Sequence, residues 1–284
     1  MKTSTLHGRR IAFIGPGTMA EAMIAGLIRE GVAPPQALIA AGPRAERLEA
    51  LTARYGIRTS TDNAAAAREA DVVVLSIKPQ VLGKVLPGLH GQIAPEALVL
   101  SIVAGAPIAR LSEGLAHPAV VRAMPNTPAQ IGMGITVWTA SAQVTEPQRA
   151  MARGVLAALG EEIFMEDEVY LDMATALSGT GPAYVFLFME ALVDAGVHLG
   201  FPRRVAERLV VQTVQGAAAY YERQQGEVHL AHLRNQVTSP GGTSAAALYY
   251  LEKAGFRTAI SRAVWAAYER ALSLAQNGKP QPPK

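Results

Sequence analysis

A glycine-rich turn near the start of the chain has the composition and spacing of a phosphate-binding site. Gly15-Pro-Gly-Thr-Met-Ala20 follows a short apolar run and opens a stretch with helical periodicity. In a G-x-G-x-x-A turn, the first glycine permits the tight bend, the second lets backbone approach a pyrophosphate, and the small third residue lets the helix pack on its strand. The start of the helix offers unpaired N–H groups to the phosphates. In this context the motif predicts a dinucleotide site, the alternative being an ordinary strand–helix turn. The predicted contacts are Gly15, Gly17, Thr18, Met19 and Ala20.

The segment after the second expected strand bears on the choice between NADH and NADPH. An acidic residue there would bind the ribose 2′-hydroxyl of NADH, whereas an arginine would accept the 2′-phosphate of NADPH. Residues 32–43 contain no Asp or Glu, and Arg44 follows at once. We therefore expect NADPH as the cofactor. NADH stays open, as does the interpretation of Arg44 as a solvated helix residue.

Several other functions lack the residues that they need. The chain has no cysteine, which excludes disulfides and thiolate chemistry and is compatible with the cytoplasmic location that we expect. His229 and His232 stand three residues apart without an evident third ligand, so no metal is expected. The 26 basic and 23 acidic residues are scattered, which is untypical of nucleic-acid binding. No signal peptide and no membrane-spanning stretch is expected.

The elements that must position the glycine turn can be read from the hydrophobic pattern. In the first half of the chain, short apolar runs alternate with helical stretches, which indicates a parallel sheet covered on both faces. The expected fold class is therefore α/β, with an N-terminal doubly wound sheet of the Rossmann type. The expected strands are 10–14, 37–41, 71–77, 98–103 and 120–124, with weaker ones at 135–138 and 162–165.

The second half of the chain reads as helices alone. Helical patterns cover 182–199, 202–225, 243–254 and 256–275, and no strand is convincing after residue 172. We therefore expect a Rossmann domain over residues 1–167 and an all-helical domain over 168–284. The acidic cluster 166–168 reads as a solvated junction, and the tail 277–284 is expected to be disordered.

Six short motifs, in this order, resemble those of pyrroline-5-carboxylate reductases across residues 9–275. The glycine turn is the first of them, and each later one is also short, but their common order is specific to this family. The other five are Ser76-Ile-Lys-Pro-Gln80, Ser101-Ile-Val-Ala-Gly105, Arg122-Ala-Met-Pro-Asn-Thr-Pro128, Leu177-Ser-Gly-Thr-Gly-Pro-Ala-Tyr184 and Ser239-Pro-Gly-Gly-Thr-Ser244.

The resemblance implies a helical C-terminal dimerisation domain that interlocks with a second subunit, and an intertwined dimer that many members build into larger rings. In that family, loops matching Ser76, Lys78-Pro79, Ala104-Gly105 and Asn126 lie at the cofactor, and Asn63 matches an asparagine that contacts the adenosine ribose. The last motif binds the substrate carboxylate. Its residues here are Ser239, Gly241, Gly242, Thr243 and Ser244.

Some of these segments also have purely structural interpretations. Lys78-Pro79 would equally suit a strand end before a helix-starting proline, and Met124–Pro128 a stiff turn. Ser239 or Thr243 would serve as a plain helix cap. The free N–H groups at the start of that helix nevertheless suit a carboxylate, and the two glycines leave room for it.

The resemblance implies hydride transfer from a reduced nicotinamide to the imine of 1-pyrroline-5-carboxylate, which gives L-proline in the last step of proline biosynthesis. Ser244 stands where the family usually has a catalytic threonine, and we expect its hydroxyl to order the ring nitrogen and assist proton transfer. Thr18 and Thr180 also depart from the usual asparagine and serine. The Ser244 departure leaves open a related reductase of a six-membered imine; a nucleotide-binding sensor without catalysis is the more distant alternative.

Overall fold

The computed structural model describes residues 6–224 and 227–277, and its contacts divide the chain into two compact units. Unit 1 takes in residues 1–181 and 266–284, and unit 2 takes in residues 182–265. The division expected at residue 168 stays a prediction. Of the tail expected to be disordered, residues 278–284 lie outside the described residues.

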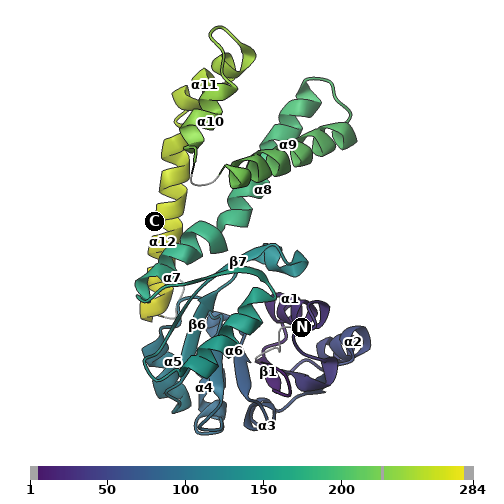
Figure 1. Cartoon of the computed structure of the whole chain (residues 1–284), viewed down its shortest axis with the longest axis vertical. Coiled ribbons are helices and arrows are strands. Elements are labelled where there is room, and N and C mark those ends of the chain that lie inside the picture. Colours follow the sequence, from purple (N-terminus) through teal and green to yellow (C-terminus); the bar gives the residue numbers. More distant parts are fainter. Residues whose placement is uncertain (1–5, 225–226, 278–284) are drawn as a thin grey trace. The chain divides into compact units, whose positions relative to one another are not determined.

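Unit 1 contains the sheet of the molecule (Figure 1). The sheet has eight strands in the order β3-β2-β1-β4-β5-β6-β7-β8. Every neighbouring pair is parallel except β6 and β7, which run antiparallel. The expected α/β class and doubly wound sheet are confirmed. The strands are β1 (Ile11–Ile14), β2 (Leu38–Ala41), β3 (Arg58–Ser60), β4 (Val72–Leu75), β5 (Leu98–Ser101), β6 (Val120–Met124), β7 (Gly134–Ala140) and β8 (Gly160–Phe164).

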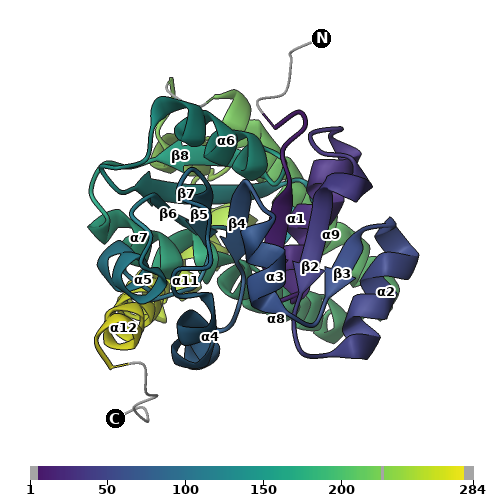
Figure 2. The same cartoon turned by 90° about the horizontal axis from the view of Figure 1, so that it is seen from below.

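Helices cover both faces of this sheet, as the continuous apolar strands require. One face carries α1 (Thr18–Arg29), α2 (Ala45–Tyr55) and α6 (Glu146–Ala157). The other carries α3 (Asn63–Arg68), α4 (Leu82–Leu89) and α5 (Ile108–Leu115). Figure 2 shows α6 on one side of the strands and α4 and α5 on the other. Short 3₁₀ turns complete the connections at Pro35–Ala37 (η1), Pro79–Val81 (η2) and Thr127–Ile131 (η3).

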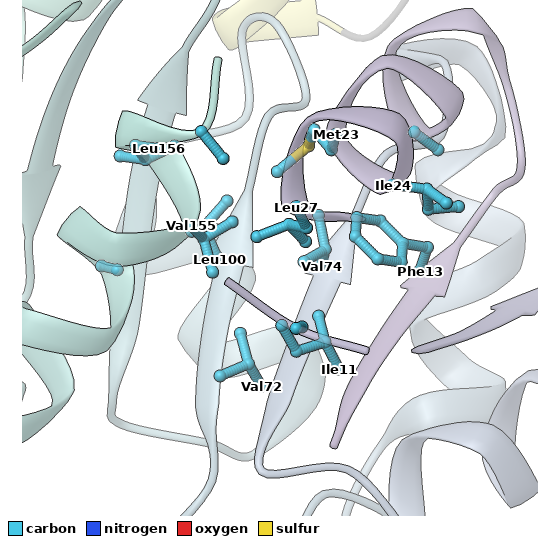
Figure 3. Packing of buried hydrophobic residues seen from close by; sticks show 14 of the residues in the cluster. Ile11, Phe13, Met23, Ile24, Leu27, Val72, Val74, Leu100, Val155 and Leu156 are labelled. Carbon is cyan, nitrogen blue, oxygen red and sulfur yellow. The ribbon is translucent and has the colours of Figure 1, made fainter. Parts of the chain in front are cut away.

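The larger of the two cores lies between the sheet and α1, α2 and α6 (Figure 3). Phe13 of β1, Val74 of β4 and Leu100 of β5 are fully buried there against Met23 and Leu27 of α1. Burial of each side chain of this size contributes about 1.5–3 kcal/mol. The glycine turn between β1 and α1 is therefore held by two elements that are both firmly packed.

The first segment of unit 1, residues 1–181, ends in an irregular helical stretch that the hydrophobic pattern did not reveal. Helix α7 (Val169–Ala174) runs into a π-helical turn, η4 (Thr175–Gly179). The Thr180 hydroxyl donates a hydrogen bond to the carbonyl of Thr175 at 2.8 Å, so this departure from the family's serine keeps the hydroxyl bonded to backbone. π-Helical turns occur often at functional sites, and this one overlaps the start of the Leu177–Tyr184 motif.

The described residues of unit 2 form helices joined by loops and contain no strand, as expected. Two long antiparallel helices, α8 and α9, form a hairpin (Figure 1), and Val193 packs on Ala206 and Val210 between them. The helices that contribute to unit 2 are α8 (Gly181–His198), α9 (Arg203–Arg223), α10 (Leu230–Gln236), α11 (Thr243–Lys253) and α12 (Phe256–Asn277).

Large apolar side chains of unit 2 lie exposed on the single chain. Phe186 is 64% exposed, Leu187 67% and Leu199 82%. By length and composition alone, Val169–His198 would qualify as a membrane span, with 11% of its most apolar window buried. By that criterion alone, this helix passes a test that the sequence analysis expected no stretch to pass. One such helix is weak evidence for a membrane, since a helix covered by another protein surface has the same composition.

Candidate active site

The residues predicted to bind the cofactor all follow carboxyl ends of parallel strands in unit 1. The sheet order changes direction between β1 and β4, and ligands of doubly wound sheets bind at such a switch point. Their positions are as follows: Gly15, Gly17, Thr18, Met19 and Ala20 follow β1, Arg44 follows β2, Asn63 follows β3, Ser76, Lys78 and Pro79 follow β4, Ala104 and Gly105 follow β5, and Asn126 follows β6.

The glycine turn is fixed by its neighbours on both sides. Gly15 has φ +95°, and its N–H donates to the Ala41 carbonyl at 2.9 Å. A Cβ on Gly15 would lie 2.4 Å from the Ile77 side chain and 3.0 Å from its backbone, so no other residue fits. The Ser76 hydroxyl donates to the Gly15 carbonyl at 2.9 Å. Ser76 therefore holds the turn through its side chain.

The start of α1 meets the requirements of a phosphate site. Gly17 is the N-cap residue, no side chain of the described residues caps the helix, and a Cβ on Gly17 would meet nothing within 4 Å. Ala20 is fully buried against the strands, as the third position of the fingerprint requires. The N–H groups of the first turn are thus unclaimed by side chains and approachable, and such groups bind phosphate oxygens well.

Two polar side chains near the ends of β2 and β3 lack partners. Arg44 is exposed at the N-cap of α2, and its guanidinium makes no hydrogen bond or ion pair with another described residue. Asn63 begins α3, and its side-chain oxygen is buried without a hydrogen-bond partner among the described residues. An unsatisfied buried oxygen costs about 1–3 kcal/mol, so a donor from a bound molecule would stabilise it. Both residues fit a dinucleotide.

The loops after β4 and β5 present a mixed picture. Lys78 is exposed before Pro79, and its ammonium has no partner among the described residues. Ala104 and Gly105 form a tight turn between β5 and α5. Lys78 thus places an unpartnered charge at the carboxyl edge of the sheet, whereas Gly105 is buried.

The side chain of Asn126 is already hydrogen-bonded within the protein and is not free to contact the cofactor. Its amide nitrogen donates to the Ser178 carbonyl at 3.2 Å, and its amide oxygen accepts from the Ile135 N–H at 3.0 Å. A Cβ on Gly179 would lie 2.7 Å from the Met124 side chain, so the loop after β6 packs closely on the π-helical turn. Asn126 therefore ties together two motifs that lie 52 residues apart.

The predicted substrate loop lies in unit 2, before α11. Gly241 has φ +71°, which favours glycine, and the Gly242 N–H donates to the Ser239 carbonyl at 3.0 Å. A Cβ on Gly242 would lie 2.5 Å from the Ser239 hydroxyl oxygen. Gly242 is the N-cap, and neither Ser239 nor Thr243 caps the helix with its side chain. The half-buried Ser244 hydroxyl has no partner among the described residues.

A partly buried ion network, which no local sequence pattern predicted, lies beside the glycine turn. Arg47 Nε donates to the Pro16 carbonyl at 2.9 Å, and its Nη2 lies 2.5 Å from Glu21 Oε2. Glu21 Oε1 also accepts from Tyr55 and Arg54, each at 2.9 Å. Burial alone would raise the pKa of Glu21, but these hydrogen bonds and the two guanidinium charges outweigh it and hold that pKa below its usual value. The sequence signal that could have revealed this network is the acidic Glu21 in the first helical turn after the fingerprint.

A second missed network joins the motif of β6 to α7. The buried Arg122 donates to Glu168 at 3.0 Å and to Asp172 at 2.6 Å. Glu168 also accepts from the Ile108 N–H at 2.9 Å, at the start of α5. The interpretation of residues 166–168 as a solvated junction is therefore wrong for Glu168, because a buried arginine requires its carboxylate.

The histidines contribute no metal centre within the described residues. No group of three or more His, Asp or Glu side chains is placed to hold an ion there. His229 instead caps α10, where its Nδ1 accepts from the Ala231 N–H at 3.1 Å.

Comparison with known proteins identifies the family to which this chain belongs. The family model described as pyrroline-5-carboxylate reductase dimerisation matches residues 168–274, and that described as NADP oxidoreductase, coenzyme F420-dependent, matches residues 10–105. The pyrroline-5-carboxylate reductase of Synechocystis sp. is 43% identical over 267 residues, which cover 94% of this chain and 98% of that relative. The chain belongs to the pyrroline-5-carboxylate reductase family. The resemblance found in its motifs is confirmed.

Other members agree with this assignment. The pyrroline-5-carboxylate reductase of Pseudomonas aeruginosa is 43% identical over 94% of this chain and 97% of its own. The Plasmodium falciparum pyrroline carboxylate reductase structure with NADP bound has a TM-score of 0.87 at 30% identity and covers 94% and 98% of the two chains. The Coxiella burnetii pyrroline-5-carboxylate reductase has a TM-score of 0.85 at 36% identity, over 95% and 99%. The enzyme class is that of NAD(P)H-dependent oxidoreductases, as expected.

Proposed function

We propose that this chain reduces the cyclic imine of 1-pyrroline-5-carboxylate to L-proline with a reduced nicotinamide dinucleotide, as the last step of proline biosynthesis. One observation carries the proposal: the chain has two approachable helix starts without side-chain caps, each after a glycine-rich turn, at the two positions where the family motifs stand. One of them suits a pyrophosphate and the other a carboxylate.

We propose NADPH as the preferred cofactor. The exposed, unpartnered Arg44 after β2 is available for a 2′-phosphate, and the buried oxygen of Asn63 requires a donor such as a ribose hydroxyl. The Plasmodium relative was solved with NADP, which supports the same preference. Further contacts are proposed from the α1 turn (Gly15, Gly17, Thr18, Met19 and Ala20), from Lys78 and Pro79, and from Ala104 and Gly105, with Ser76 and Asn126 holding the loops.

The proposed substrate loop is Ser239–Ser244. The N–H groups at the start of α11 and the positive end of its dipole favour a carboxylate. A side chain on Gly242 would displace the Ser239 hydroxyl and crowd the Ser239 carbonyl. Ser239, Gly241, Gly242, Thr243 and Ser244 are the residues that we assign to this role.

The cofactor supplies the hydride for the imine carbon, and the protein supplies orientation and electrostatics. A protonated imine is already electrophilic, so a strong acid in the protein is unnecessary. The Ser244 hydroxyl makes no hydrogen bond to another described residue. It can therefore hydrogen-bond to the ring nitrogen of the substrate, which orients the ring, and assist proton transfer to that nitrogen. Serine keeps the donor of the family's threonine but lacks the methyl group that restricts its rotamer.

Substitution of Ser244 tests this assignment. We expect Ser244→Ala to lower kcat by roughly 10- to 100-fold, because a hydrogen bond to a charged group is worth about 1.5–3 kcal/mol. Ser244→Thr, which restores the hydroxyl, should keep kcat within a few fold of wild type. The dissociation constant of NADPH should stay the same in both variants. A Ser244→Ala enzyme with normal kcat would remove Ser244 from the mechanism.

We also propose that the exposed apolar surface of unit 2 is covered by a second copy of the chain. The dimerisation family model spans the helices that carry it, and a dimer would account for the apolar composition of Val169–His198 without a membrane. The intertwined dimer and its assembly into a larger ring are further steps of this proposal. The cytoplasmic location stays a prediction.

A further inference from the structure

We propose that Arg47 is a positioning residue for the dinucleotide, which it serves by holding the carbonyl side of the glycine turn. The inference rests on the proposed function, since it presupposes a dinucleotide at the start of α1. It adds a residue that belongs to none of the family motifs described above.

Arg47 connects three parts of the phosphate site at once. Its Nε donates to the Pro16 carbonyl at 2.9 Å, its Nη2 to the Gly17 carbonyl at 3.4 Å, and the same Nη2 to Glu21 at 2.5 Å. Pro16 and Gly17 lie inside the turn, and Glu21 lies in the first turn of α1. A planar guanidinium can make these contacts together, whereas an ammonium on a flexible stem cannot.

The N–H groups at the start of α1 are available for a phosphate, and the carbonyl groups of the turn bind donors from the protein. The Gly15 carbonyl accepts from the Ser76 hydroxyl and from the Gly17 N–H, and the Gly17 carbonyl accepts from the Glu21 N–H at 3.0 Å. The Pro16 carbonyl has no backbone donor among the described residues, and Arg47 supplies its hydrogen bond while adding a second, longer one to Gly17. The charge of Arg47 also offsets the Glu21 carboxylate, which would otherwise repel a pyrophosphate at this helix start.

Arg47 is itself held in place. Its side chain is 27% exposed and that of Glu21 18%, and Tyr55 and Arg54 occupy the other carboxylate oxygen of Glu21. Arg44 lies one helical turn earlier, exposed and without a partner. The two arginines therefore have separate roles: Arg47 acts on the turn that holds the pyrophosphate, and Arg44 is free for a 2′-phosphate.

This separation predicts a distinct binding pattern. The pyrophosphate is common to NADPH and NADH, so Arg47→Gln should raise the dissociation constants of both by the same factor, at least about tenfold. Arg44→Gln should raise that of NADPH and leave that of NADH unchanged. The matched control is Arg54→Gln, which removes the other ion pair of Glu21 at a 70% exposed side chain and should change neither constant by more than about twofold.

The experiment is titration of NADPH and NADH into wild type and the three variants, followed by nicotinamide fluorescence, with thermal melting to confirm folding and with kcat and imine KM measured at saturating cofactor. In Arg47→Gln, kcat and imine KM should stay near wild type while both cofactor constants rise. Unchanged binding of both dinucleotides, or loss of NADPH binding alone, would overturn the inference. If Arg47→Gln does not fold, Arg47→Lys is judged by the same two outcomes. A wild-type protein that binds neither dinucleotide would instead overturn the proposed function.

Discussion

At the scale of single residues, hydrogen bonding distinguishes two kinds of site residue. Some side chains already bond within the fold and hold the loops in place, and others have no partner and can bind a ligand. Ser76 and Asn126 both belong to family motifs, yet their side chains are engaged by backbone at 2.9–3.2 Å. Arg44 and Asn63 have unsatisfied groups. A side chain already bonded within the fold acts on a ligand through the loop that it positions, because its donors and acceptors are taken.

The buried His117 allows a test of the structure that does not depend on catalysis. It is 3% exposed, and its Nε2 lies 2.8 Å from the Ala97 carbonyl. Burial lowers the pKa of His117, and the hydrogen bond to Ala97 offsets this only in part. The unfolded chain, with the ordinary histidine pKa of 6.5, thus binds a proton more readily than the folded chain.

The contribution of His117 to the free energy of unfolding should therefore be complete above pH 6.5. This free energy should fall as the pH drops from 6.5 through the lower pKa of the folded state. In His117→Gln, which cannot be charged, this decline between pH 7 and pH 5 should become shallower. Urea unfolding at several pH values measures it. Equal slopes in wild type and His117→Gln would contradict the assignment.

At the scale of elements, the sequence predicts what depends on local pattern. The fully buried strands β1, β4 and β5 are continuous apolar runs and are found where they were expected. Strand β3 has the sequence Arg-Thr-Ser at the sheet edge, without an apolar run to signal it, and was missed. The antiparallel direction of β7 was also missed, because apolar content is the same for either direction.

The candidate site divides along the same line. The fingerprint and the glycines before α11 are local signals, and both were found from the sequence. The partners of Arg122 lie 46 and 50 residues away, and Glu21 and Arg47 belong to different helices, so no window of sequence connects them. Long-range ion pairs depend on packing and appear only once the fold is known.

At the scale of the whole molecule, the two units carry different parts of the proposed chemistry. Residues assigned to the cofactor belong to unit 1, and residues assigned to the substrate carboxylate belong to unit 2. Unit 2 exposes many large apolar side chains, and contiguous apolar patches on soluble monomers are usually small.

Assembly is therefore predicted for the wild-type protein. Sedimentation velocity at micromolar concentration should show a dimer of the 29.9 kDa chain or a multiple of that dimer. Phe186→Glu should shift the protein toward the monomer, because a charge replaces a 64% exposed aromatic ring on α8. Ile163→Glu, on the exposed part of β8 outside the matched dimerisation region, is the control and should leave assembly unchanged. A wild-type monomer would contradict the prediction.

The measurement that tests the central claim most directly is NADPH oxidation by the purified protein with 1-pyrroline-5-carboxylate, followed by loss of the reduced-nicotinamide absorbance. NADH and the six-membered imine are assayed beside it. Rapid oxidation with the five-membered ring, faster with NADPH than with NADH, is the predicted result. No oxidation with that ring, together with turnover of the six-membered imine, would contradict the assigned substrate and point to Ser244 as the residue that changed it.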